Sequence, residues 1–145
     1  MRSTARLPTG ALRRSTTETD KAASQGEHKM IRRKEECVVE HREHMRDGDG
    51  TVIVTNFIAG PEELCGKGRL FSKLTLHPGC GVGYHIHDKD SELFYIVKGT
   101  AEYNDNGTPV TVSEGDVMIC PVGQGHSITN CSDEDAEVIA VIVYE

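Results

Sequence analysis

Three histidines and one glutamate occur at spacings that suit a metal site. The first stretch reads Gly79-x5-His85-x-His87-x4-Glu92-x6-Gly99, and the second reads Gly115-x5-Pro121-x-Gly123-x2-His126-x3-Asn130. Imidazole and carboxylate groups are common ligands of transition metals in proteins. We therefore predict that His85, His87, Glu92 and His126 bind one metal ion.

Strand geometry explains why these intervals can bring the four side chains together. Side chains alternate faces along a strand, so His85 and His87 share one side, roughly 6.6 Å apart at Cα. The turn after His87 is expected to reverse the chain and return Glu92 on the neighbouring strand. We expect a loop to deliver His126, and Asn130 to cap the following turn rather than to bind metal.

The predicted ligand set limits the metal and its chemistry. Three neutral imidazoles and one carboxylate suit Mn, Fe, Co, Ni or Zn better than Ca or Mg, which prefer oxygen ligands throughout. The expected cofactor is one divalent transition-metal ion, and the sequence does not choose among these five. A six-coordinate ion would keep two positions for water or substrate. The site would carry a charge of about +1, which favours an anionic or enolisable ligand.

Other residues near the motifs are candidates for a pocket wall, a turn and proton transfer. Phe94 and Ile128 share strand parity with Glu92 and His126, so they are candidate walls of a substrate pocket, although filling of the barrel interior explains them equally well. The sequence Asp88-Lys89-Asp90 is predicted to form a solvated turn. No general base is evident beyond the ligands. Polar residues to inspect for proton transfer are Lys73, Tyr95 and Glu114.

Short apolar runs separated by Gly, Pro, Asn and Asp predict an all-β fold. The expected strands are 51–58, 70–76, 84–87, 92–98, the segment between Gly99 and Asn106-Gly107, 111–113, 117–120, 127–129 and 137–144. Asn-Gly is the favoured two-residue hairpin turn. Nine strands with no helix longer than ten residues describe a sandwich or barrel.

The length of 145 residues suits one domain. Residues 36–145 are predicted to be that domain, and residues 1–35 an N-terminal extension. The beginning of the extension is rich in Arg and Ser and poor in acid, as in a transit peptide, but it lacks helical amphipathicity. A disordered tail, vector-derived sequence, or a natural start at Met30 are the alternatives.

Composition indicates the partners and the compartment. The net charge of −7 argues against nucleic acid and against an anionic membrane surface as partners. Five cysteines with no CxxC pair fit reduced thiols in the cytoplasm. Residues 93–97 and 138–144 are apolar on both faces, so we predict that a homodimer covers the outward face. The charged segment 36–46 could instead be an arm that crosses between subunits.

Both motifs closely resemble the two conserved motifs of the cupin superfamily, over about residues 70–145. The resemblance implies a double-stranded β-helix, or jelly-roll barrel, of the RmlC-like type. It also implies that His85, His87, Glu92 and His126 hold a metal inside the barrel.

The superfamily contains both enzymes and binding proteins, so the resemblance does not settle the function. The leading hypothesis is a metal-dependent dioxygenase, decarboxylase, lyase or isomerase that acts on a small polar or anionic molecule. The alternative is a non-catalytic sugar-binding, small-molecule-binding or accessory cupin with a structural metal. Two-domain oxalate decarboxylases and seed storage proteins need twice this length, and a cupin transcription factor needs a helix-turn-helix that the sequence lacks.

Overall fold

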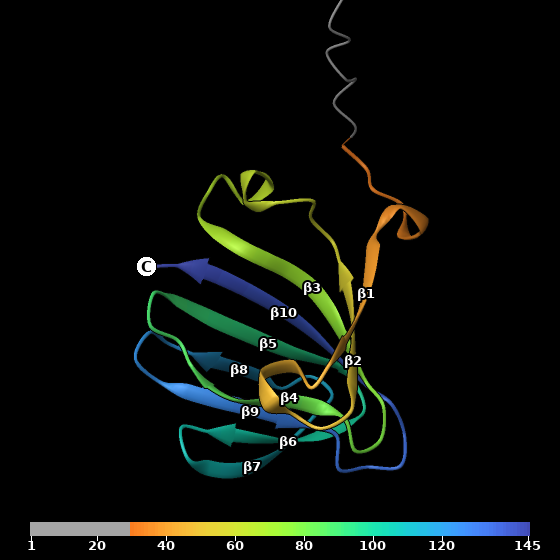
Figure 1. The fold of residues 1–145 in the computed structure, drawn as a ribbon, viewed down its shortest axis with the longest axis vertical. Coiled ribbons are helices and arrows are strands. Elements are labelled where there is room, and N and C mark those ends of the chain that lie inside the picture. Colours follow the sequence, from red (N-terminus) through yellow and green to blue (C-terminus); the bar gives the residue numbers. More distant parts are fainter. Residues whose placement is uncertain (1–29) are drawn as a thin grey trace, which may run out of the picture. The chain divides into compact units, whose positions relative to one another are not determined.

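Two antiparallel β-sheets face each other and enclose an apolar interior (Figure 1). The structure is a computed structural model, and it describes residues 30–145. Within this part, regular structure is almost entirely strand, apart from the 3-10 turns η1 (Lys34–Glu36), η2 (Met45–Asp47) and η3 (Pro61–Leu64). The predicted all-β class is therefore confirmed.

The larger sheet has six strands in the order β1-β2-β3-β10-β5-β8. Their bounds are β1 Val38–Glu43, β2 Thr51–Asn56, β3 Gly68–Leu76, β10 Ala136–Tyr144, β5 Asp90–Lys98 and β8 Val117–Cys120. The smaller sheet has the order β4-β9-β6-β7. Its strands are β4 Gly81–Ile86, β9 Gly125–Thr129, β6 Thr100–Asp105 and β7 Thr108–Ser113. Every pairing in both sheets is antiparallel.

Alternating side chains from both sheets fill the interior. Along β3, Leu74 and Leu76 are buried while the residues between and before them are partly exposed. The inward face of β10 shows the same two-residue period. The inner residues of β4 and β9, Val82 and Ile128, are opposite each other in the smaller sheet and are also buried. This alternation is the period-2 pattern that predicted the strands.

All nine predicted strands are present, most of them with shifted ends, and the described residues contain a tenth. The segment predicted as a charged arm contains β1, which pairs with β2 of the same chain. The partly buried side chains of β1 are charged, so a pattern of alternating apolar residues did not indicate this strand. Its inward side carries Glu40 and Arg42, which form an ion pair of 2.8 Å, and Glu40 also accepts a 2.8 Å hydrogen bond from Asn56.

The hairpin predicted at Asn106-Gly107 is confirmed. These two residues join β6 to β7, and both have positive φ, 47° for Asn106 and 104° for Gly107. That is the backbone of a tight turn that favours Asn followed by Gly. The Asn104 side chain also accepts a 2.7 Å hydrogen bond from the Gly107 amide.

The turn after His87 does something different from what the sequence analysis expected. Strands β4 and β5 are not neighbours, because β4 belongs to the smaller sheet and β5 to the larger one. The prediction that the turn returns Glu92 on the neighbouring strand is therefore wrong. The chain crosses between the sheets here. His85 and His87, at the end of β4, therefore face Glu92 on β5 across the interior.

The predicted N-terminal extension falls mostly on residues 1–29, which lie outside the described residues. Ile31–Glu145 form one compact unit. In this unit the Arg32 guanidinium donates hydrogen bonds to both carboxylate oxygens of Glu63 and to the Phe57 carbonyl. The boundary between residues 35 and 36 stays a prediction. Among the described residues, no helix is long and apolar enough to cross a membrane.

Candidate metal centre

A β-bulge in β4 determines which side chain enters the interior. Val82 is opposite Ile128 and His85 is opposite His126, so Gly83 and Tyr84 together face a single residue of β9. The extra residue reverses the alternation after Val82. As a result His85 lies inside, whereas the Tyr84 side chain is half exposed. Tyr84 thus faces away from the site, as its parity with His85 predicted.

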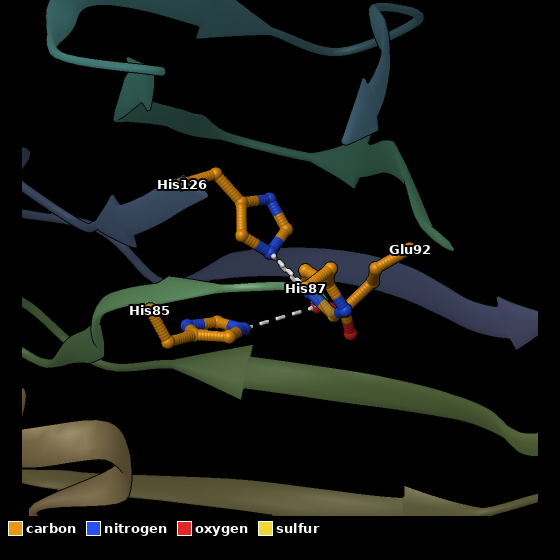
Figure 2. A group of neighbouring side chains, drawn as sticks. All are labelled: His85, His87, Glu92 and His126. Atoms are coloured by element: carbon orange, nitrogen blue, oxygen red, sulfur yellow. Dashed lines mark hydrogen bonds and ion pairs between the residues drawn. The ribbon is translucent and has the colours of Figure 1, made fainter. Parts of the chain in front are cut away.

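The four predicted ligands come together from both sheets (Figure 2). His85 belongs to β4, His87 follows its last residue, and Glu92 belongs to β5 in the opposite sheet. His126 lies in β9, so its predicted delivery by a loop is wrong. It is opposite His85 in the strand register, so the pairing of β9 with β4 places it beside the other ligands.

The facing atoms of these side chains are three imidazole Nε2 atoms and one carboxylate oxygen. Glu92 Oε2 lies 2.9 Å from the Nε2 of His126, 3.2 Å from that of His87 and 3.5 Å from that of His85. The Nε2 atoms of His87 and His126 are 3.1 Å apart. Ligand bonds of about 2.1 Å at right angles place neighbouring donors about 3 Å apart. The donor set therefore fits a transition-metal ion in both chemistry and spacing.

Each imidazole is oriented by a partner at its other nitrogen. The Nδ1 of His85 is 2.9 Å from the Gly83 carbonyl, and the Nδ1 of His87 is 2.5 Å from Asp90 Oδ1. The Nδ1 of His126 is 2.9 Å from the Tyr103 hydroxyl. A carbonyl or carboxylate at Nδ1 requires the proton there, which leaves the Nε2 lone pair free. His85 and His87 are thereby held ready to bind a cation.

Burial and hydrogen bonding shift the pKa values of Glu92, His87 and His126. Burial alone would raise the pKa of Glu92, but hydrogen bonds from His126, His85 and His87 hold that pKa far below its usual range. The Glu92 carboxylate in turn raises the pKa of His87. Burial lowers the pKa of His126, which favours its neutral form. An ionised Glu92 and a neutral His126 are the forms in which these groups bind a metal ion.

A cavity of about 230 Å³ opens onto this cluster. Its lining includes His85, Glu92, several apolar side chains and three arginines, Arg42, Arg46 and Arg69. This volume is below the range of drug-sized pockets, so the cavity suits a small ligand.

The two predicted pocket residues occupy different positions. Phe94 lines the cavity and stacks on His126, with ring centroids 5.0 Å apart and planes 16° from parallel. Ile128 is fully buried in the apolar core and is not among the residues that line the cavity. The roles of both in binding a substrate stay predictions.

Asn130 caps the turn after β9, as expected, because its side-chain oxygen accepts hydrogen bonds from Ser132.

Several residues around the site were not identified from the sequence. Asp90 was predicted to lie in a solvated turn, which is wrong: it is 8 % exposed and bonds both His87 and Arg69. A carboxylate three residues after a ligating histidine was the available signal. No comparable sequence signal marks Tyr103 or the three arginines of the cavity lining, because strand pairing determines whether they approach the site. Lys73, by contrast, forms an ion pair with Glu137, away from the ligands.

Comparison with known proteins identifies the family. The cupin domain family matches residues 72–142. The "Oxalate-binding protein" of Thermotoga maritima is 37 % identical over 114 residues, which cover 79 % of this chain and 93 % of that protein. The chain is a cupin. The double-stranded β-helix and the single cupin domain implied by the motifs are thus confirmed.

Solved structures agree with this fold. A crystal structure described as a "predicted oxalate decarboxylase" from Thermotoga maritima matches with a TM-score of 0.76 at 36 % identity, covering 80 % of this cupin and all of that chain. A protein with a double-stranded β-helix domain from Klebsiella pneumoniae matches with a TM-score of 0.59 at 21 % identity, covering 80 % of this chain and 90 % of that one. The second likeness concerns the fold alone.

The hydroxyl of Tyr103 can be tested as a support for His126. We expect Tyr103→Phe to weaken divalent-metal binding by about 10- to 100-fold, because the variant removes the group that fixes the His126 ring. Calorimetric titration of chelator-treated protein with Mn²⁺ or Zn²⁺ measures this. The matched control is Tyr95→Phe, since Tyr95 is exposed on the outward side of β5. Equal metal affinity in the Tyr103 variant and the wild type would contradict the assignment.

Proposed function

We propose that this cupin binds one divalent transition-metal ion through His85, His87, Glu92 and His126, and uses it to capture a small dicarboxylate of the oxalate class. The observation that carries the proposal is the convergence of three Nε2 atoms and one carboxylate oxygen beside a cavity whose lining includes His85, Glu92 and three arginines. The name of the Thermotoga maritima relative supports the ligand class. The length that argues against a two-domain oxalate decarboxylase does not argue against a single-domain oxalate-binding cupin.

The charges around the cavity favour an anion despite the acidic chain. A divalent ion with three neutral imidazoles and one carboxylate has a net charge of about +1, and guanidinium groups lie in the same lining. A bound cation supplies an open position for a carboxylate oxygen and stabilises its negative charge. Local charge therefore opposes the overall net charge of −7 at this point.

The cavity supports binding more directly than turnover. Decarboxylation of oxalate requires a proton for the carbon that loses carbon dioxide. Apart from the ligands His85 and Glu92, the titratable residues in the lining are arginines, which keep their protons. A metal-dependent enzyme is the second candidate, favoured by a donor set of four that leaves a six-coordinate ion with two open positions.

Two further proposals concern assembly and compartment. The outward face of the larger sheet exposes apolar side chains on three neighbouring strands, including Val117 (61 %), Ile119 (63 %) and Tyr95 (45 %). Contiguous apolar surface of this kind is typical of subunit contacts, which supports a homodimer formed through this face. All five cysteines are unpaired thiols, which supports a cytoplasmic location.

The proposed function is tested with protein stripped by chelator and then reloaded with one metal at a time. We expect oxalate to bind the reloaded protein and to raise its melting temperature, because a ligand that binds only the native state stabilises it. The stripped protein and a His87→Ala variant exposed to the same metal are the controls, and neither should respond.

Proton and carbon NMR of the same mixture separate the two candidate functions. Unchanged oxalate after prolonged incubation under air and under nitrogen supports capture without turnover, whereas formate or carbon dioxide identifies an enzyme. Oxalate binding of equal strength with and without metal would contradict the proposal.

The homodimer is tested by a charge on the outward face. We expect Ile119→Lys to convert the dimer to a monomer in light scattering, because a buried lysine without a partner disfavours association. Val110→Lys is the matched control, since Val110 is 44 % exposed on β7 of the other sheet. A monomeric wild-type protein, or an Ile119 variant that stays dimeric, would refute this interface.

A further inference from the structure

The segment around η2 has an uncommon backbone beside the cavity. His44, Arg46 and Asp47 have φ values of 48°, 54° and 60°, in the left-handed region that residues other than glycine rarely adopt. Such conformations cost free energy and persist only where the surrounding structure imposes them. Arg46 is the bulkiest of the three, and it lies in the lining of the cavity.

Close backbone contact holds η2 in place against β4. A Cβ atom on Gly83 would lie 1.9 Å from the Arg46 carbonyl oxygen, and one on Gly48 would lie 2.3 Å from the Gly81 carbonyl oxygen. The two backbones therefore meet where only glycine fits. Gly83 is also part of the bulge that orients His85 and accepts the hydrogen bond of its Nδ1. The position of Arg46 is thus coupled to the position of a metal ligand.

The three arginines of the lining differ in how their charges are balanced. Arg42 forms an ion pair with Glu40 at 2.8 Å, and Arg69 forms one with Asp90 at 2.8 Å. Arg46 has no carboxylate partner among residues 30–145. Among the arginines of this lining, Arg46 is therefore the one whose charge is not balanced by a carboxylate within residues 30–145.

From these observations we infer that Arg46 is a specificity-determining residue that binds the second, metal-remote carboxylate of the ligand. This inference rests on the proposed function. Guanidinium recognises carboxylate through paired, charge-assisted hydrogen bonds. A small dianion can satisfy both the metal and Arg46 within a cavity of about 230 Å³. A monoanion of the same shape leaves one of the two without its partner, so the site distinguishes dicarboxylates from monocarboxylates.

Oxalate and oxamate test this distinction, because they share a skeleton and oxamate replaces one carboxylate by a neutral amide. Both are titrated calorimetrically into metal-reloaded wild type, Arg46→Gln, Arg46→Lys and Arg33→Gln. Arg33 is an exposed arginine outside the cavity lining, so its variant is the matched charge control. Metal affinity and melting temperature of each variant are measured alongside, as readouts independent of the ligand.

We expect wild type to prefer oxalate over oxamate by at least tenfold. Arg46→Gln should weaken oxalate binding by at least tenfold and leave oxamate binding and metal affinity unchanged, so the preference disappears. Arg46→Lys should restore part of it, and Arg33→Gln should match wild type. Wild-type protein that binds metal but neither ligand would overturn the proposed function and this inference with it. Tight oxalate binding that is equal in Arg46→Gln and wild type would overturn the inference alone.

Discussion

The packing of three imidazoles against one carboxylate inside an apolar barrel is the constraint on which the rest of the site depends. Buried polar groups are costly unless each has a partner, and buried charges more so. Each buried side-chain nitrogen and oxygen in the described part of the chain has such a partner. At the histidines these partners are the Gly83 carbonyl, Asp90 and Tyr103, all at Nδ1. The Nε2 atoms are left to converge on Glu92, an arrangement that a cation completes.

The construction of the fold follows from this constraint. The ligands come from opposite sheets, so the interior must close around them, and the crossing after His87 makes this possible. The bulge in β4 reverses the alternation of inward and outward side chains, so that His85 points into the interior. The backbone of η2 packs closely on this bulge at Gly83. A chain of contacts therefore links the metal ligands to the cavity wall. Asp90 adds a second link, since it joins His87 to Arg69.

The fold and the ligand set were predictable from the sequence because they rest on local periodicity and spacing. Alternating apolar residues indicated the strands, and Asn106-Gly107 indicated its hairpin. The pairing of strands that are far apart in the chain could not be predicted from the sequence. Whether the turn after His87 stays within one sheet or crosses to another depends on partners far along the chain, so the neighbouring-strand prediction failed. Arg46 reaches the cavity only because η2 packs beside β4, and Tyr103 meets His126 only because β6 pairs with β9.

If the four convergent side chains form one metal-binding unit, removal of the carboxylate charge must weaken metal binding. Calorimetric titration of chelator-treated protein with Mn²⁺, for wild type and for Glu92→Gln, tests it most directly. The glutamine side chain keeps the shape of the glutamate but lacks the negative charge that the three imidazoles surround. We expect one site per chain in the wild type and at least tenfold weaker binding in the variant. No stoichiometric binding by the wild type, or equal affinity in both proteins, would contradict it.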